Sequence, residues 1–341
     1  MKKLISILVL SVFLVPALFA ASISSPAPTV KLTTNEVITR DQLASEVEKY
    51  KAAGYSSVTD SDVLEAMINE IVFIQGAKRD GYYVDDRTLD SIYLSQKQNI
   101  EAQAGQSLTD KEFEDMVVSQ YGSVDAYKDY LREQSIMNQY VPAMKADMVE
   151  NVAQPTDRDI TNWYRKNQTS IFSQGYMVRV SVITFARSSD EAVDKASLAK
   201  ANEIYSKIEN GTLTFEKAVQ QYSEDTSSKS KGGDVGWLVD SDVSRQAVGD
   251  EFVDTVMELD VGEIKGVITT PSDYVIAKVT ASEEAKILSL DDYVSPDSNM
   301  TVREYIRQGL LYQNSQYAFL NAYQSLIDDL KSQAKINRLI K

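Results

Sequence analysis

The apolar residues between Ser61 and Gly81 repeat with the period of an α-helix. They are spaced three or four positions apart and comprise Leu64, Met67, Ile68, Ile71, Ile74 and Ala77. Ser61 and Asp62 stand where an N-cap residue belongs, and Gly81 stands where a helix ends. The pattern predicts a helix with one buried face.

The same periodicity extends over most of residues 36–171. It predicts further helices, each opened by Ser, Thr or Asp, over residues 41–53, 86–104, 109–120, 123–151 and 156–170. Another helix is predicted over 301–340, and its apolar stripe must be buried against some other part of the protein. We therefore expect this C-terminal helix to pack back on the N-terminal helices.

Residues 177–283 follow a different pattern, in which β-branched runs alternate with short helices. The expected β-runs cover 178–185, 266–270 and 274–280, and the expected helices cover 188–209, 215–222 and 245–259. A polar loop over 223–233 separates the last two helices. The segment has the size of one domain. The predicted fold class is therefore α+β and multidomain: a helical domain, completed by the C-terminal helix, with one α+β domain inserted.

The N-terminal residues have the pattern of an export signal. Lys2 and Lys3 precede an apolar run over 4–21, and small residues cluster over 20–25. We expect cleavage among those small residues and a periplasmic or otherwise extracytoplasmic location. An uncleaved membrane anchor is the alternative, because the run is just long enough to span a bilayer.

The composition removes several kinds of chemistry. The 341 residues include no Cys and no His, which excludes disulfides, thiol nucleophiles and imidazole as a base or metal ligand. Lys and Arg number 35 against 50 Asp and Glu, and the formal net charge of −15 opposes binding to nucleic acid. The paired acids at 85–86, 291–292 and 328–329 lack the spacing of a calcium loop. We expect no metal and no cofactor.

Short motifs follow one another in a distinctive order along the α+β segment. They are Tyr222-Ser223-Glu224-Asp225, Gly232-Gly233-Asp234-Val235-Gly236-Trp237, Glu251-Phe252, Gly262-Glu263 and the run over 274–279. This order resembles the parvulin-type (PpiC-like) peptidyl-prolyl isomerase family, and the helical flanks are similar in pattern to the SurA, PrsA and PpiD group of export chaperones. The resemblance implies a signal peptide over 1–21, a helical SurA-N-like chaperone domain over 22–174, a parvulin-like domain over 175–283 and a C-terminal helix over 284–341.

The resemblance also implies which residues form the isomerase pocket. Val182 and Val275 stand where family members carry histidines, and Asp225 stands where they carry a polar Cys or Asp. The family's apolar wall positions are filled by Leu238, Val248 and Phe252. The resemblance thus implies a catalytic role for Asp225 alone and substrate contacts for the other five residues.

These replacements bear on whether the domain is active. Proline isomerisation twists an amide bond against a barrier of about 18–20 kcal/mol, and it needs no covalent nucleophile. An apolar pocket favours the twisted amide, and well-placed hydrogen bonds supply much of such catalysis. Because two valines supply no donor, the sequence predicts a degenerate or weakly active isomerase. The simpler interpretation of Val182 and Val275 is strand core, and that of Asp225 is an exposed loop carboxylate.

Tyrosine and methionine are frequent in the predicted helices at both ends of the chain, among 19 Tyr and 9 Met in all. Tyr offers apolar contact with a hydrogen-bonding tip, and Met adapts to varied shapes. Two interpretations remain for several of these residues: an ordinary core, or a surface that binds unfolded polypeptides. The residues are Tyr121, Tyr127, Tyr130, Met137, Tyr140, Met144, Met148, Tyr312, Tyr317 and Tyr323.

The leading hypothesis is an exported chaperone that binds unfolded secreted or outer-membrane polypeptides, with a degenerate or weakly active isomerase domain. The alternative is an active peptidyl-prolyl cis-trans isomerase that assists the folding of exported proteins. A third hypothesis is a surface-exposed binding protein that keeps only the scaffold. The expected partners are unfolded or proline-containing exported polypeptides, with no nucleic acid and no metal, and with the membrane only if the signal stays uncleaved.

Overall fold

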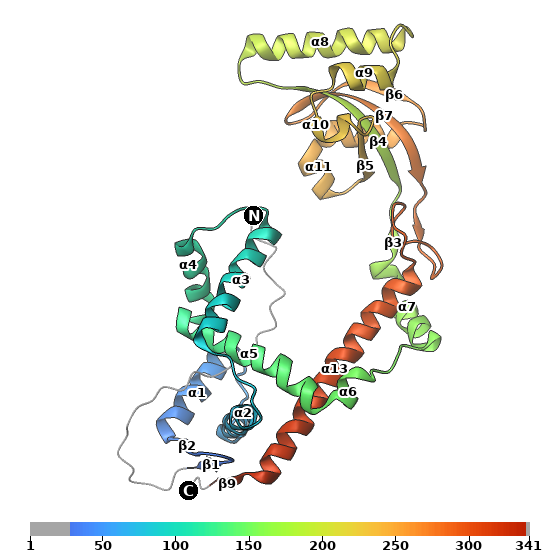
Figure 1. Ribbon diagram of the computed structural model, residues 1–341. Helices are drawn as coiled ribbons and strands as arrows, with labels where there is room; N and C mark the ends of the chain where they lie inside the picture. Colours follow the sequence, from blue (N-terminus) through green and yellow to red (C-terminus); the bar gives the residue numbers. More distant parts are fainter. Residues whose placement is uncertain (1–27, 339–341) are drawn as a thin grey trace. The chain divides into compact units, whose positions relative to one another are not determined.

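The computed structural model describes residues 28–338. The predicted signal peptide, 1–21, lies outside the described residues. The chain forms two compact units (Figure 1). One unit joins the residues up to Gln154 with those from Leu310 onward, and the other is Pro155–Gly309. The first consists mainly of helices and the second mixes helices with a sheet, so the predicted α+β fold class is confirmed.

Helices build the first unit, here called the helical unit. Its helices α1 to α5 each begin after a Ser, Thr or Asp whose side chain accepts a backbone N–H hydrogen bond. Their bounds are α1 Arg40–Ala52, α2 Asp60–Arg79, α3 Asp86–Ala104, α4 Asp110–Tyr121, α5 Val124–Met144 and α6 Ala146–Glu150. The long C-terminal helix, α13 Val302–Gln333, belongs to this unit from Leu310 onward.

Two expected helix limits are wrong. Helix α2 starts after Thr59 instead of Ser61, because Thr59 and Asp62 cap each other's backbone N–H groups. The single helix expected over 123–151 is divided into α5 and α6 at Lys145, whose backbone leaves the helical region (φ −133°, ψ 39°). The division follows one turn after Pro142, which has no backbone N–H to donate.

The C-terminal helix shares its core with the N-terminal helices. The residues of α13 that take part are fully or almost fully buried: Ala322, Leu326, Ile327 and Leu330. Helices α2 and α13 approach closely at Gly76, where an added Cβ would lie 2.5 Å from Leu330 Cδ2. Lys331 Nζ donates to Glu65 on α2 at 2.8 Å. Apolar burial, at about 25 cal/mol per Å², holds the two ends of the chain together.

A small antiparallel sheet closes the helical unit. Its order is β2 (Asn35–Val37), β1 (Thr29–Lys31) and β9 (Lys335–Asn337). The helix expected over 301–340 therefore ends early, at Gln333, and the chain continues as a strand. The reason is a long-range pairing, Lys31 with Lys335 and Val30 with Ile336, that no local periodicity encodes.

The second unit, here called the α+β unit, contains a four-stranded antiparallel sheet in the order β5-β4-β7-β6. The strands are β4 Met177–Ala186, β5 Asp234–Val239, β6 Ile264–Thr269 and β7 Asp273–Glu283. The helices between them are α8 Glu191–Glu209, α9 Phe215–Tyr222, α10 Thr226–Lys229, α11 Asp242–Val248 and α12 Asp250–Glu258. The flanking elements are α7 Asp157–Ile171 and the paired strands β3 Ser173–Gln174 and β8 Lys286–Ile287.

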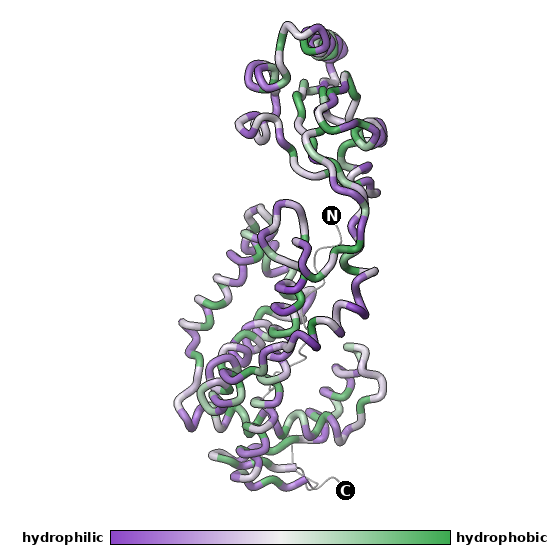
Figure 2. The backbone as a smooth tube through the Cα atoms, turned by 90° about the vertical axis from the view of Figure 1, so that its right-hand side faces the viewer, coloured by the Kyte–Doolittle hydropathy of each residue, from purple (hydrophilic) through white to green (hydrophobic). Residues whose placement is uncertain are grey.

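The central strands β4 and β7 are buried on both faces. Ile183 and Phe185 of β4 pack with α8 and α9, whereas Val178, Val180 and Val182 pack with α12. Strand side chains alternate between faces, so every second residue of β4 belongs to the same core. Figure 2 shows the resulting concentration of hydrophobic residues along these strands, between more hydrophilic helices.

The α+β unit differs from the expected pattern in three places. The single helix expected over 245–259 is two helices, α11 and α12, because Gly249 between them has a φ of +89°. No strand is expected where β5 forms, and the loop expected over 223–233 contains the short helix α10. The unit is also wider than 175–283, since α7 and the β3–β8 pair belong to it. The domain limits themselves stay a prediction.

Candidate functional site

One cavity of about 420 Å³ opens beside the sheet of the α+β unit. This volume lies in the range of ordinary ligand pockets. All six residues that the sequence singles out lie around it: Val182, Asp225, Leu238, Val248, Phe252 and Val275. Their roles in binding and catalysis stay predictions.

The inner end of the cavity is apolar. Val182 on β4, Val275 on β7 and Phe252 on α12 are 4–5% exposed and belong to one hydrophobic cluster. Leu238 on β5 and Val248 on α11 pack against that cluster and are partly exposed. An apolar ring fits such an end, and none of these five side chains offers a hydrogen bond.

A glycine fixes the loop next to Val182. The backbone N–H of Val182 donates to Gly233 O at 2.9 Å, and Gly233 has a φ of +85°. A Cβ at Gly233 would lie 2.5 Å from Val182 O. Only glycine permits both the left-handed backbone and this close approach. The Gly-Gly-Asp motif therefore acts by holding the segment before β5 against β4.

Asp225 lies at the cavity and caps helix α10. Its Oδ1 accepts hydrogen bonds from the backbone N–H of Ser227 at 3.0 Å and from Ser227 Oγ at 2.6 Å. Its Oδ2 accepts one from Ser228 Oγ. These donors, Ser227 first, hold the pKa of the Asp225 carboxyl below its usual range. Asp225 is thus an ionised helix cap with both oxygens engaged, and it has no proton to donate near neutral pH.

The outer end of the cavity is polar, and the sequence reasoning missed most of it. Besides Asp225 it is formed by Thr184, Glu224, Thr270, Ser272 and Asp273. Two sequence signals could have located them. Thr184 is the next residue on the cavity-facing side of β4 after Val182, and the β6–β7 turn directly precedes β7, the strand that carries Val275.

Backbone hydrogen bonds attach both polar segments to the end of β4. Thr184 O accepts from the N–H of Glu224 at 3.0 Å, and Glu224 Oε2 accepts from the N–H of Ala186 at 2.9 Å. On the other side, the N–H of Arg187 donates to Ser272 O at 2.9 Å. The polar end is therefore built from three chain segments that meet at one strand terminus.

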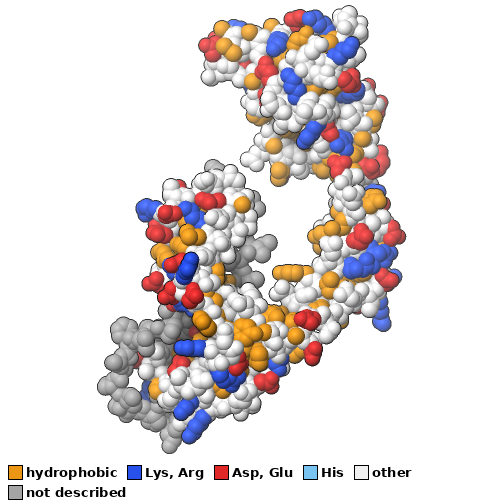
Figure 3. Space-filling view, viewed as in Figure 1, with side chains coloured by type: hydrophobic (Ala, Val, Ile, Leu, Met, Phe, Trp, Pro, Cys, Tyr) orange, Lys and Arg blue, Asp and Glu red, His pale blue; other side chains and the backbone are white. Residues whose placement is uncertain are grey.

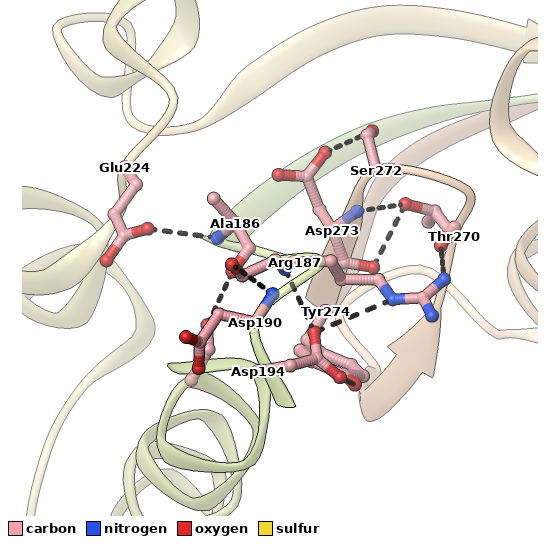
Figure 4. A network of polar contacts seen from close by, with 11 residues as sticks. Ala186, Arg187, Asp190, Asp194, Glu224, Thr270, Ser272, Asp273 and Tyr274 are labelled. Carbon is pink, nitrogen blue, oxygen red and sulfur yellow. Dashed lines mark hydrogen bonds and ion pairs between the residues drawn. The ribbon is translucent and has the colours of Figure 1, made fainter. Parts of the chain in front are cut away.

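A wider network of polar contacts holds the β6–β7 turn in place (Figure 4). Arg187 Nη1 donates to Thr270 O at 3.0 Å, and the Arg187 guanidinium lies over the ring of Tyr274. The Tyr274 hydroxyl donates to Asp194 Oδ2 at 2.7 Å, which holds the pKa of Asp194 below its usual range. Asp194 also lies 4.0 Å from Arg187 Nε. These contacts tie the turn to helix α8.

Comparison with known proteins finds a family match for part of the chain. Residues 182–281 match the family model of the rotamase described as PPIC-type PPIASE domain. The Foldase protein PrsA of Clostridium botulinum (strain Langeland / NCTC 10281 / Type F) is 25% identical over 274 residues, which cover 80% of this chain and 71% of that protein. The Chaperone SurA of Nitrosococcus oceani is 26% identical over 285 residues, which cover 80% of this chain and 62% of that protein.

The chain also has a limited likeness to solved structures. A chain of the SurA-like chaperones PEB4 and Cj1289 of Campylobacter jejuni is 15% identical, and the match covers 92% of this chain and 99% of that chain with a TM-score of 0.37. The predicted resemblance is confirmed: the segment 182–281 carries a PPIC-type peptidyl-prolyl isomerase domain, within a chain similar to PrsA foldases and SurA chaperones.

Proposed function

We propose that this protein is an exported chaperone that binds unfolded secreted or outer-membrane polypeptides, and that its isomerase domain is degenerate or weakly active. The similarity to PrsA foldases and SurA chaperones supports the general class. The observation that carries the proposal is a set of large apolar side chains left exposed on the helical unit.

The exposed set lies on α5, α6 and α13. On α13, Tyr312, Tyr317 and Leu320 are 68%, 58% and 59% exposed, and Met144 and Met148 are exposed at the end of α5 and on α6. Figure 3 shows hydrophobic side chains gathered on the visible surface over these helices. We call these five residues the apolar face. Large exposed apolar side chains that gather on one surface are typical of sites that bind other polypeptides.

The Tyr and Met residues divide between the core and the surface of the helical unit. Tyr127 and Tyr140 are buried, and four others are partly buried against the same core: Tyr121, Tyr130, Met137 and Tyr323. The remaining four, Met144, Met148, Tyr312 and Tyr317, are exposed. The exposed members support a surface for varied clients, because Tyr and Met adapt to different partners at low cost.

The cavity supports a weak isomerase. An apolar ring can enter between Val182, Val275 and Phe252, yet these side chains place no hydrogen-bond donor near it. Asp225 is an ionised cap, so it cannot donate to an amide nitrogen or oxygen. The pocket would therefore hold proline while lacking much of the polar assistance that accelerates rotation.

An active isomerase is the second candidate, and one observation favours it. The hydroxyls of Thr184, Thr270 and Ser272 line the outer end of the cavity and could replace donors of another type. Thr270 Oγ1 already donates to Asp273 O at 3.0 Å and Ser272 Oγ donates to the Asp273 carboxylate, which leaves Thr184 as the stronger candidate.

Export is part of the proposal and rests on the N-terminal pattern of Lys2, Lys3 and the apolar run 4–21. Within residues 28–338, no helix has the length and apolar character needed to cross a bilayer. Mass spectrometry of the native protein tests the proposal. A mature N-terminus between residues 20 and 25 supports export with cleavage, whereas an intact Met1 form in the membrane fraction supports an anchor.

Aggregation of an unfolded outer-membrane protein tests the chaperone function. The full-length protein should suppress aggregation at a near-stoichiometric ratio. The triple variant Tyr312→Ser, Tyr317→Ser, Leu320→Ser should lose most of this effect while keeping its helical circular dichroism. A matched control is Tyr83→Ser, at a Tyr that is 71% exposed in the same unit between α2 and α3. Full protection by the triple variant would reject the apolar face as the client site.

A further inference from the structure

The charged side chains that line the cavity all carry the same sign. Among the residues that the structure describes, they are Glu224, Asp225 and Asp273, and no Lys or Arg lines the cavity. The three carboxylates lie at the polar end, and the opposite end is a closed apolar wall. The cavity thus combines an apolar socket with a negative rim.

The register of β4 gives the spacing between the two ends. Val182, Thr184 and Ala186 follow one another on the cavity side of the strand, and each step of two residues advances about 6.6 Å. Ala186 is paired with Asp273 across the sheet, and its N–H donates to Glu224. An extended peptide likewise advances about 3.3 Å per residue, so two of its residues span one such step. A side chain one or two positions from a proline seated at Val182 would therefore reach the negative rim.

The basic side chains near these three carboxylates do not neutralise the negative charge of the rim. Lys200 Nζ lies 3.6 Å from Glu224 Oε1, but both side chains are nearly half exposed, so this ion pair is weak. Arg187 is engaged by Thr270 O and Asp194, and Lys229 Nζ donates to Ser223 O at 2.9 Å. Asp273 forms no ion pair among the described residues; its carboxylate accepts a hydrogen bond from Ser272 Oγ.

We propose that the cavity selects proline segments in which a Lys or Arg flanks the proline, because the negative rim formed by Glu224, Asp225 and Asp273 complements a cationic side chain. This inference rests on the proposed function, in which the cavity holds proline. Electrostatic complementarity at an open rim mainly provides specificity, and it weakens as salt screens the charges.

The test measures binding of three blocked tetrapeptides, acetyl-Ala-Xaa-Pro-Phe-amide with Xaa as Lys, Gln or Glu, to the full-length protein. At low salt the Lys peptide should bind roughly tenfold more tightly than the Glu peptide, with Gln between them, and the ratio should fall toward one at 0.5 M salt. The variant Glu224→Gln, Asp273→Asn keeps the oxygen acceptors for Ala186 N–H and Ser272 Oγ. It should reduce the Lys preference over Glu to about twofold.

A matched control variant also removes two negative charges, but from the opposite face of the sheet. Glu203 on α8 and Glu216 on α9 pair with Lys207 and Lys278 and do not line the cavity. The variant Glu203→Gln, Glu216→Gln should keep the full Lys preference. Equal binding of all three peptides by the native protein would overturn the charge selection and leave the proline site standing. Failure to bind any of them would reject the cavity as a proline site, and this inference with it.

Discussion

The carboxyl groups of Glu70 on α2 and Glu133 on α5 interact with one another in the helical unit. Burial and the neighbouring carboxyl raise the pKa of Glu70 to about 9, and burial raises that of Glu133 to about 7. Near neutral pH the pair therefore retains at least one proton, which is the state that permits a hydrogen bond between two carboxyl groups.

Few positively charged side chains are available to balance the charge of Glu70 and Glu133. Glu46 on α1 is 4% exposed, its Oε1 pairs with Lys49, and its Oε2 has no hydrogen-bond partner. Other ionisable groups that act on the pair come from the surrounding elements: Glu36 of β2, Tyr50 of α1, Asp129 and Arg132 of α5 and Tyr323 of α13. Protonation is thus the main means of stabilising the cluster.

The helical unit should lose stability as pH rises. Both folded pKa values exceed the ordinary value of 4.5, so the folded state binds more protons than the unfolded state between about pH 4.5 and 9. The stabilising contribution is fully present below pH 4.5 and disappears as pH passes through about 7 and then 9. Thermal unfolding followed by helical circular dichroism from pH 5 to 9 should show a falling midpoint.

The substitution Glu70→Gln should flatten this pH dependence and raise the unfolding free energy at pH 9 by an amount on the order of 1 kcal/mol. Both tryptophans, Trp163 and Trp237, lie in the α+β unit, so their fluorescence provides an internal reference that should not follow the change. Glu65→Gln is the control on α2, because the Arg338 hydrogen bond lowers the pKa of Glu65 to about 2. The Glu65→Gln variant should lower the unfolding free energy of the helical unit at pH 7. A Glu70→Gln variant with unchanged pH dependence would contradict the shared-proton assignment.

Much of this architecture could be predicted from local patterns, and the failures have a common cause. The limits of α3 and α9 agree with the periodicity because each has a side-chain cap at its start and its own apolar face. Strand β9 and the partly buried Glu70 cannot be predicted from local sequence, since each depends on residues from distant helices or strands. In the cavity, the apolar side chains were found through the motif order, whereas Thr184 and Ser272 come together only when β4 meets the β6–β7 turn.

Asp225 should contribute to stability more than to rate. Replacing it with Ala removes three hydrogen bonds at the start of α10 and should destabilise the α+β unit by about 1 kcal/mol, read from tryptophan fluorescence. Asp225→Asn keeps an acceptor oxygen, so it should recover most of that stability. Proline isomerisation by the Asn variant, measured by nuclear magnetic resonance exchange on a Gln-Pro peptide, should stay within about twofold of native. A large loss of rate with preserved stability would favour the active-enzyme candidate.

Histidines at the two valine positions should increase isomerase activity. Val182 and Val275 lie on adjacent strands and line the same cavity, with Val275 directly opposite Thr184. The double variant Val182→His, Val275→His would introduce donors beside the apolar socket, and positioned donors or acids typically contribute tenfold or more. We expect at least a tenfold gain in kcat/KM over the native protein on the same peptide. Val178→His is the control, since Val178 is buried in the same cluster and does not line the cavity. A native rate already equal to that of the double variant would show that the valines do not limit catalysis.

The contact between Gly76 and Leu330 should hold α13 on α2. A Cβ at Gly76 would lie 2.5 Å from Leu330 Cδ2 and 3.2 Å from Tyr140 Oη, so Gly76→Ala forces these side chains to move. Overpacking of this kind costs about 1–3 kcal/mol, which exceeds the roughly 1 kcal/mol that alanine gains over glycine within a helix. Helical circular dichroism should therefore show a lower unfolding midpoint, while tryptophan fluorescence of the α+β unit stays unchanged.

A double-mutant cycle distinguishes this contact from a general loss of helix stability. Leu330→Ala alone leaves a cavity in the core and should cost about 2–5 kcal/mol. In the Gly76→Ala, Leu330→Ala protein the new methyl group occupies part of the space that Leu330 vacates, so the combined loss should be smaller than the sum of the single losses by about 1 kcal/mol or more. Strict additivity would mean that the two residues do not touch in solution, and that α13 packs on the N-terminal helices through other side chains.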